Sequence, residues 1–108
     1  MTIQDTLNAR RSRHGDFNAR AEIAQDLKAR FFEAKSREAF PLAAQVQALE
    51  VIFDKLARIA AGDDTFDDHW HDIAGYATLG EMAVKAFVNG KPHEEPKRRP
   101  GLQESVCA

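Results

Sequence analysis

The fold is decided by the stretch "PLAAQVQALEVIFDKLARIAAG", residues 41–62, in which apolar side chains recur with a near-heptad spacing. This spacing predicts a helix over residues 41–61 that is apolar on more than a narrow stripe. Pro41 suits the first helical position, and Gly62 suits a left-handed cap after the last. The stripe consists of Leu42, Val46, Leu49, Phe53, Leu56 and Ala60, flanked by Ile52 and Ile59.

Two helices are expected before this stretch. Residues 3–12 have the pattern of a short helix, and Gly15 interrupts it. Asp16 is a good N-cap for a longer second helix, which ends before a turn at residues 36–41. The apolar face of the second helix consists of Phe17, Ala21, Ala24, Leu27 and Phe31, widened by Ile23 and Phe32.

A last helix is expected after Gly62. Thr65 and Asp68 form a capping-box pattern, with aspartate in place of the usual glutamate, so the helix should begin at Thr65. Gly90 and Pro92 should end it. Its expected apolar stripe consists of Trp70, Ile73, Ala77, Gly80, Val84 and Phe87.

The chain shows no sustained period-two alternation, so strands are not expected. We predict an all-α fold, an antiparallel helical bundle of three substantial helices plus one short N-terminal helix, in a single domain of residues 1–90. The two longest helices, about 30 Å each, cover only part of one another's apolar faces. We therefore expect a homo-oligomer, most simply a dimer, that completes the core.

Composition excludes several classes of protein. The 108 residues are 44% hydrophobic and 30% charged with a net charge of −2, a balance that argues against a general nucleic-acid binder. No apolar run reaches the roughly 18 residues of a membrane span. The amino terminus lacks the apolar core of a secretion signal, so we expect a cytoplasmic protein. Cys107 is the single cysteine, and residues 91–108 are expected to form a disordered tail.

Acidic pairs at a spacing of four lie on two consecutive predicted helices, Glu50 with Asp54 and Asp68 with Asp72. Residues four apart share a helix face. Carboxylate oxygens are the ligands that Mg²⁺ prefers, and paired acidic helices can hold Mg²⁺ against a triphosphate. These four residues are therefore the candidate metal ligands, with Mg²⁺ as the cofactor.

The register of the helix hairpin offers another role for the same residues. A hairpin that pivots near residue 64 places Asp72 across from about residue 56 and offsets the two acidic pairs by about 9 Å. Asp72 would then pair with Lys55 or Arg58. Both interpretations, a metal site and a salt-bridged hairpin, remain open on the sequence.

Two glycines inside the last helix also need a reason, because each costs about 1 kcal/mol relative to alanine. Gly75 and Gly80 would allow either a close helix–helix approach or a ligand groove. Tyr76 would carry a hydroxyl to the boundary of the core. His69 and His71 are two apart and point in different directions, so they do not form a zinc pair.

Three segments resemble a family of small, functionally uncharacterised phage and prophage proteins. They are "HGDF" (14–17), "ALEVIFDKLARIAAGD" (48–63) and "DHWHDIAGYATL" (68–79). The resemblance implies a helical fold and a phage or prophage origin, without an activity. The matching positions are Gly15, Lys55, Arg58, Asp68, Asp72, Gly75 and Tyr76.

A more distant similarity is to the MazG-like all-α NTP pyrophosphohydrolases, which bind metal through Glu-x-x-Glu on one helix and Glu-x-x-Asp on the next. This chain has Gln47-x-x-Glu50 in the first place and Asp68-x-x-x-Asp72 in the second. One carboxylate of the pattern is an amide and the spacings differ.

Two hypotheses for function follow, from different classes. The first is a non-enzymatic, oligomeric accessory protein that binds a host or phage protein. The alternative is a Mg²⁺-dependent nucleotide-binding or pyrophosphohydrolase-like protein, in which Lys55 and Arg58 would contact phosphate. Nucleic-acid binding through "RRSR" (10–13) and "KRR" (97–99) is a weaker hypothesis, because the acidic hairpin would repel phosphate.

Overall fold

The computed structural model describes residues 2–90 of the chain. Within that range the protein is all-helical, which confirms the predicted fold class, and it contains no strand. The predicted tail, residues 91–108, lies outside the described residues. The elements are α1 (Ile3–His14), α2 (Phe17–Ala34), the short 3₁₀ turn η1 (Arg37–Ala39), α3 (Ala43–Ala61) and α4 (Asp67–Val88).

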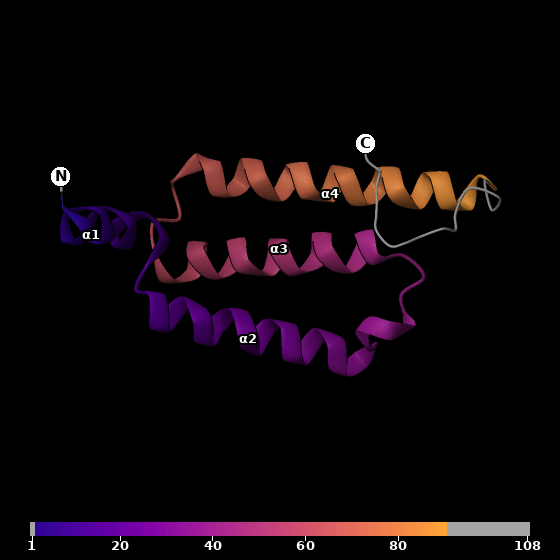
Figure 1. Cartoon of the computed structure of the whole chain (residues 1–108), viewed down its shortest axis with the longest axis horizontal. Helices are drawn as coiled ribbons and strands as arrows, with labels where there is room; N and C mark the ends of the chain where they lie inside the picture. The colour runs from indigo at the N-terminus through magenta and orange to yellow at the C-terminus, as the bar shows by residue number, and fades with distance from the viewer. Residues whose placement is uncertain (1, 91–108) are drawn as a thin grey trace.

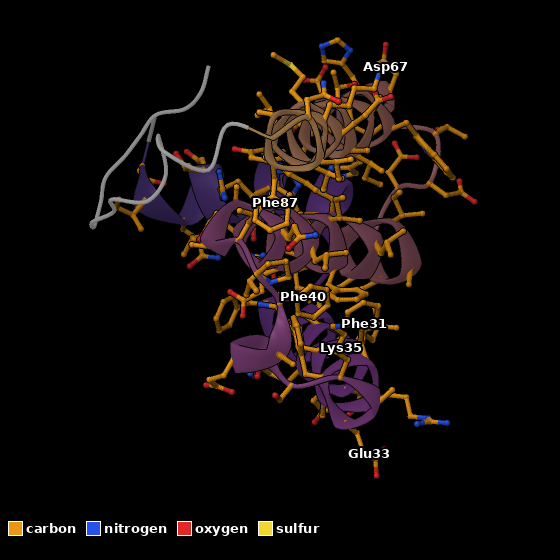
Figure 2. All side chains as sticks on the ribbon, turned by 90° about the vertical axis from the view of Figure 1, so that its right-hand side faces the viewer. Phe31, Glu33, Lys35, Phe40, Asp67 and Phe87 are labelled. Carbon is orange, nitrogen blue, oxygen red and sulfur yellow. The ribbon has the colours of Figure 1, made fainter. Side chains whose placement is uncertain are left out.

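The three long helices run alternately in opposite directions and lie side by side, with α3 between α2 and α4 (Figure 1). Seen from the end, α4, α3 and α2 are stacked one above another (Figure 2). The bundle is therefore an open layer, one helix thick, in which α3 has a neighbour on each of two opposite sides. Helix α1 continues past one end of this layer (Figure 1).

The predicted helix boundaries hold at Asp16 and fail at three other positions. Leu42 is the N-cap of α3 and the helix begins at Ala43, so Pro41 does not hold the first helical position. The carboxylate of Asp16 accepts a hydrogen bond from the backbone N–H of Ala19 at 3.2 Å, as an N-cap does. Gly62 ends α3 with φ −127°, so the predicted left-handed cap is wrong. Thr65 does not cap α4, because its hydroxyl donates to Asp63 at 2.6 Å; the helix begins at Asp67.

The buried core of the layer is small. Four aromatic rings join α2 and the following turn to α3, with neighbouring centroids 5.1–6.4 Å apart. These rings belong to Phe31, Phe32, Phe40 and Phe53. The buried apolar side chains among the described residues are Ala24, Phe32, Ala48 and Ala57.

The predicted stripe of α4 is wrong at its first position. Trp70 is 54% exposed, whereas the preceding residue, His69, is 1% exposed and faces the rest of the protein. The Trp70 indole N–H donates to the backbone carbonyl of Asp64 at 2.9 Å, which holds the ring over the α3–α4 loop. At its start, α4 therefore faces the rest of the protein through His69 and not through Trp70.

Gly15 allows the α1–α2 junction to pack against the end of α3. Its φ is +84°, and a Cβ atom built there would lie 2.5 Å from the backbone carbon and oxygen of Ala61. A side chain at this position would therefore both strain the backbone and collide with α3.

We expect Gly15→Ala to lower the free energy of unfolding by more than about 2 kcal/mol, because strain and collision act together. Gly75→Ala is the matched control: its added Cβ meets no atom within 4 Å. Inside a helix this replacement should raise the free energy of unfolding by up to about 1 kcal/mol. Urea unfolding followed by circular dichroism measures both, and equal effects would contradict the close approach at Gly15.

Candidate functional site

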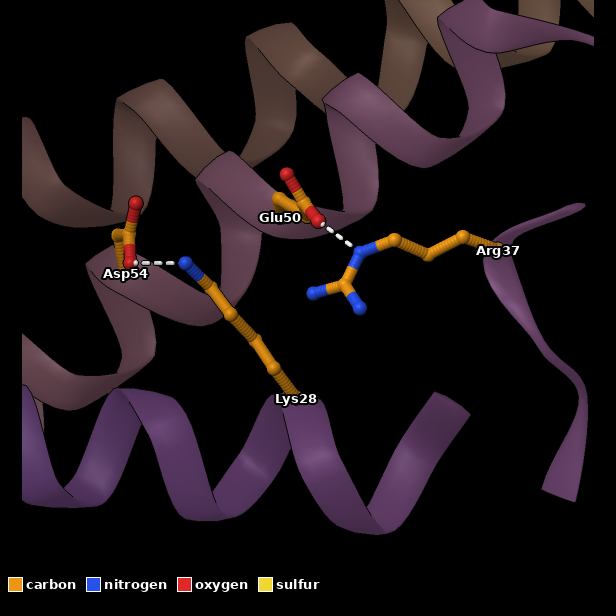
Figure 3. Close-up of polar contacts among 4 residues, drawn as sticks. All are labelled: Lys28, Arg37, Glu50 and Asp54. Carbon is orange, nitrogen blue, oxygen red and sulfur yellow. Dashed lines mark hydrogen bonds and ion pairs between the residues drawn. The ribbon is translucent and has the colours of Figure 1, made fainter. Parts of the chain in front are cut away.

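Three of the four candidate metal ligands are each paired with a cation. Asp54 accepts from Lys28 of α2 at 2.9 Å, and Glu50 accepts from Arg37 of η1 (Figure 3). Asp72 of α4 accepts from Lys55 of α3 at 2.9 Å. The carboxylates therefore connect α3 to the elements on both of its sides.

The Lys55–Asp72 pair is one of the two pairings that the hairpin register predicts. Lys55 and Asp72 are about equally far in sequence from residue 64, the predicted pivot. The same holds for Ala48 and Gly80, which also face each other: a Cβ built at Gly80 would lie 3.7 Å from the Cβ of Ala48. The hydrogen bond from Lys55 is the main cause that lowers the pKa of Asp72 below its ordinary value.

The carboxylates do not converge on a common point. Within residues 2–90, no group of three or more histidine, cysteine or acidic side chains is placed to hold a metal ion. Asp68 lies exposed in the first turn of α4, where its charge complements the positive end of the helix dipole. As arranged here, the acidic residues form separate ion pairs that hold helices together.

The pair between Lys28 and Asp54 can be measured directly. A double-mutant cycle with Lys28→Met and Asp54→Asn should give a coupling energy of about 0.5–1 kcal/mol, because the pair is partly exposed to solvent. Unfolding in urea measures each corner of the cycle. A coupling energy of zero would show that the pair does not contribute to the packing of α2 on α3.

Gly75 and Tyr76 differ in their surroundings. Gly75 is exposed and nothing lies within 4 Å of a Cβ built there, so the expected close helix approach at Gly75 is wrong. Gly80 is the glycine that faces α3, in ordinary contact with Ala48. Tyr76 is half-buried, on the same side of α4 as Gly80.

A second polar cluster, which the sequence did not indicate, lies where the four helices meet. It consists of His14, Arg20, Arg58 and His69, one residue from each of α1, α2, α3 and α4. The rings of His14 and His69 have centroids 5.0 Å apart, and both contact the ring of Phe66. We call this group the junction cluster. The signal that could have indicated His69 is an alternative α4 stripe through His69, Ile73 and Tyr76, which shares Ile73 with the predicted apolar stripe.

The junction cluster carries positive charge that changes the titration of His14. Burial, followed by the nearby charges of Arg58 and His69, lowers the pKa of His14 from 6.5 to about 4. The folded protein therefore binds a proton at His14 less readily than the unfolded chain does. Stability from this effect is present above pH 6.5 and is lost as the pH falls toward 4.

We expect the midpoint of thermal unfolding to decrease as the pH is lowered from 7 to 5. The variant His14→Gln should show a weaker decrease, because it has no side chain to protonate at the junction. His71→Asn, at an exposed position of α4, serves as the control and should keep the wild-type dependence. Equal slopes in all three proteins would contradict this role of His14.

The two sides of the helical layer differ in polarity. With 3.6 residues per turn, Leu49 and Leu56 project from α3 on the side opposite Asp54 and Arg58. Helices α2 and α4, which lie on either side of α3, have apolar side chains on the same side of the layer as Leu49 and Leu56. We call this surface the apolar face; it consists of Ile23 and Leu27 of α2, Leu49, Ile52, Leu56 and Ala60 of α3, and Trp70, Ile73, Ala77 and Val84 of α4.

The apolar face is only partly covered within one chain. Leu56 is 36% exposed and Trp70 is 54% exposed, and the other large members are half-buried. Partly exposed apolar side chains on the same side of three neighbouring helices are typical of a site of protein association. No helix among residues 2–90 is long and apolar enough to cross a membrane.

Comparisons with protein-family models, with curated proteins and with solved structures gave no match.

Proposed function

We propose that this protein is a small helical interaction module that self-associates through its apolar face. The observation that carries the proposal is the contrast between that face and the core. Few apolar side chains are buried within the described residues, while Leu56, Trp70 and their neighbours remain partly exposed. Fully burying one large apolar side chain contributes about 1.5–3 kcal/mol, so covering this face is strongly favourable.

Layer architecture supports a second copy as the occupant. Stable domains are built from at least two packed layers of secondary structure, and residues 2–90 supply one. Two copies related by a twofold axis would place the same stripe of α3 on both sides of the contact. The product would be a two-layer helical bundle with the apolar residues inside.

The position of one ion pair also supports association through the apolar face. Asp54, which pairs with Lys28 at 2.9 Å, projects from α3 on the side opposite Leu49, so a second copy on the apolar face would leave this ion pair in place. In the phage or prophage setting that the resemblance implies, such a dimer would act as a non-enzymatic accessory protein. The Mg²⁺-dependent nucleotide alternative lacks support here, because Glu50, Asp54 and Asp72 already pair with cations.

We expect the protein to sediment as a dimer, at twice the chain mass of 12.1 kDa. Leu56→Glu places a charge in the centre of the apolar face and should give a helical monomer. Leu79→Glu is the matched control: Leu79 is 48% exposed on the opposite side of α4, so its variant should remain a dimer. Sedimentation equilibrium measures the mass, and circular dichroism checks that each variant is folded.

A wild-type monomer at all concentrations would contradict the proposal, as would equal dissociation of both variants. Stabilisation by nucleotide only when Mg²⁺ is present would favour the alternative. At a hundred times the dissociation constant such binding adds about 2.7 kcal/mol to the free energy of unfolding, which thermal unfolding detects easily.

A further inference from the structure

The two arginines of the junction cluster, Arg20 and Arg58, form no ion pair with a carboxylate among residues 2–90. The charge of the Asp54 carboxylate acts on Arg20, but Asp54 is ion-paired with Lys28. Arg10 of α1 adds further positive charge to the same region.

Three hydrogen-bonding groups of the cluster, none of them on His69, have no partner among residues 2–90. The Nε atoms of Arg20 and Arg58 and the Nδ1 atom of His14 are buried without a hydrogen bond. Both arginine side chains are half-buried, and their terminal nitrogens are not among the buried atoms. The guanidinium ends therefore reach the surface with donors available, while their stems are held in the protein. The guanidinium of Arg20 is further held over the ring of Phe17, at 5.0 Å from its centroid.

Like charges at this junction disfavour one another. Burial first, and then the charges of Arg58 and Arg10, lower the pKa of Arg20 below its ordinary value. Two half-buried guanidinium groups brought together without a counter-charge are unfavourable, and a bound anion would remove that cost. Guanidinium forks match the oxygens of phosphate in pairs of parallel hydrogen bonds.

We propose that the junction cluster is a binding site for a phosphate group, held by Arg20 and Arg58 with His14 as a further donor. A ligand here contacts α1, α2 and α3 at once, and so fastens α1 to the helical layer. The groups that face it are His14 of α1, Arg20 of α2, Arg58 of α3 and His69 of α4, together with Arg10 and Asp54. Because a bound phosphate favours protonated His14, phosphate binding should raise the pKa of His14.

The test uses the full-length protein and inorganic phosphate, titrated at constant ionic strength with chloride as the competing salt. Nuclear magnetic resonance of the histidine rings follows binding, and a pH titration gives the pKa of His14 with and without phosphate. Phosphate should shift the His14 signals and raise the pKa of His14. Repeating the titration with adenosine monophosphate tells whether the site prefers a free phosphate or a phosphate carried by a nucleoside.

Arg58→Gln and Arg20→Gln should each lower phosphate affinity about tenfold or more, because each removes a charged pair of donors. Arg30→Gln is the matched control, since Arg30 is an exposed arginine of α2 paired with Glu33. If Arg58→Gln does not fold, Arg58→Lys keeps the charge without the fork and should still bind more weakly than wild type.

Three results would overturn the proposal. The first is that phosphate shifts the histidine signals no more than chloride does. The others are an equal loss of phosphate affinity in Arg30→Gln and a pKa of His14 that does not change at saturating phosphate. The two proposals are tested by different measurements: phosphate binding by the His14 signals, and the oligomeric state by the mass of the protein in solution. Failure of one proposal is therefore distinguishable from failure of the other.

Discussion

The rest of the structure depends on the packing of α3 along two opposite sides. Helices α2 and α4 both run antiparallel to it, and they reach it through different chemistry (Figure 1). Aromatic rings and two ion pairs join α3 to α2 and its turn, whereas small residues such as Ala48 and the Lys55–Asp72 pair join it to α4. A helix packed on two opposite sides keeps two free flanks, and in this chain one flank is apolar and the other charged.

How much of this could be predicted from the sequence depends on whether the signal is local. The helix predicted from the heptad pattern, the cap at Asp16 and the break at Gly15 depend on neighbouring residues. The cap and the break are found as expected, and the helix is found at Ala43–Ala61, starting two residues later than predicted. The first position of the α4 stripe was predicted incorrectly, because stripes beginning at His69 and at Trp70 both fit a helical period. Hydrophobicity favoured Trp70 as the inward-facing residue. In the structure the indole instead donates a hydrogen bond to the backbone carbonyl of Asp64 in the loop before α4.

For the acidic pairs of the candidate site, too, only the local part of the arrangement could be predicted from the sequence. A spacing of four places Glu50 and Asp54 on one face of α3, and this much can be read from the sequence. Their cations, Arg37 and Lys28, come from earlier elements whose register against α3 is set by aromatic packing. No local pattern reveals that register. The junction cluster could not be predicted for a similar reason, since its members come from four different helices.

On α3, the flank proposed for self-association differs from the flank that carries Arg58. Arg58 projects from α3 on the side opposite Leu49, so a second copy seated on the apolar face would leave the guanidinium of Arg58 in solvent. The junction lies at the end of the layer, where His14 and Gly15 fix α1 to α3 and α4. An anion there would act on α1, which has few contacts of its own with the layer. Association would stabilise the layer, and the anion would set how firmly α1 is held.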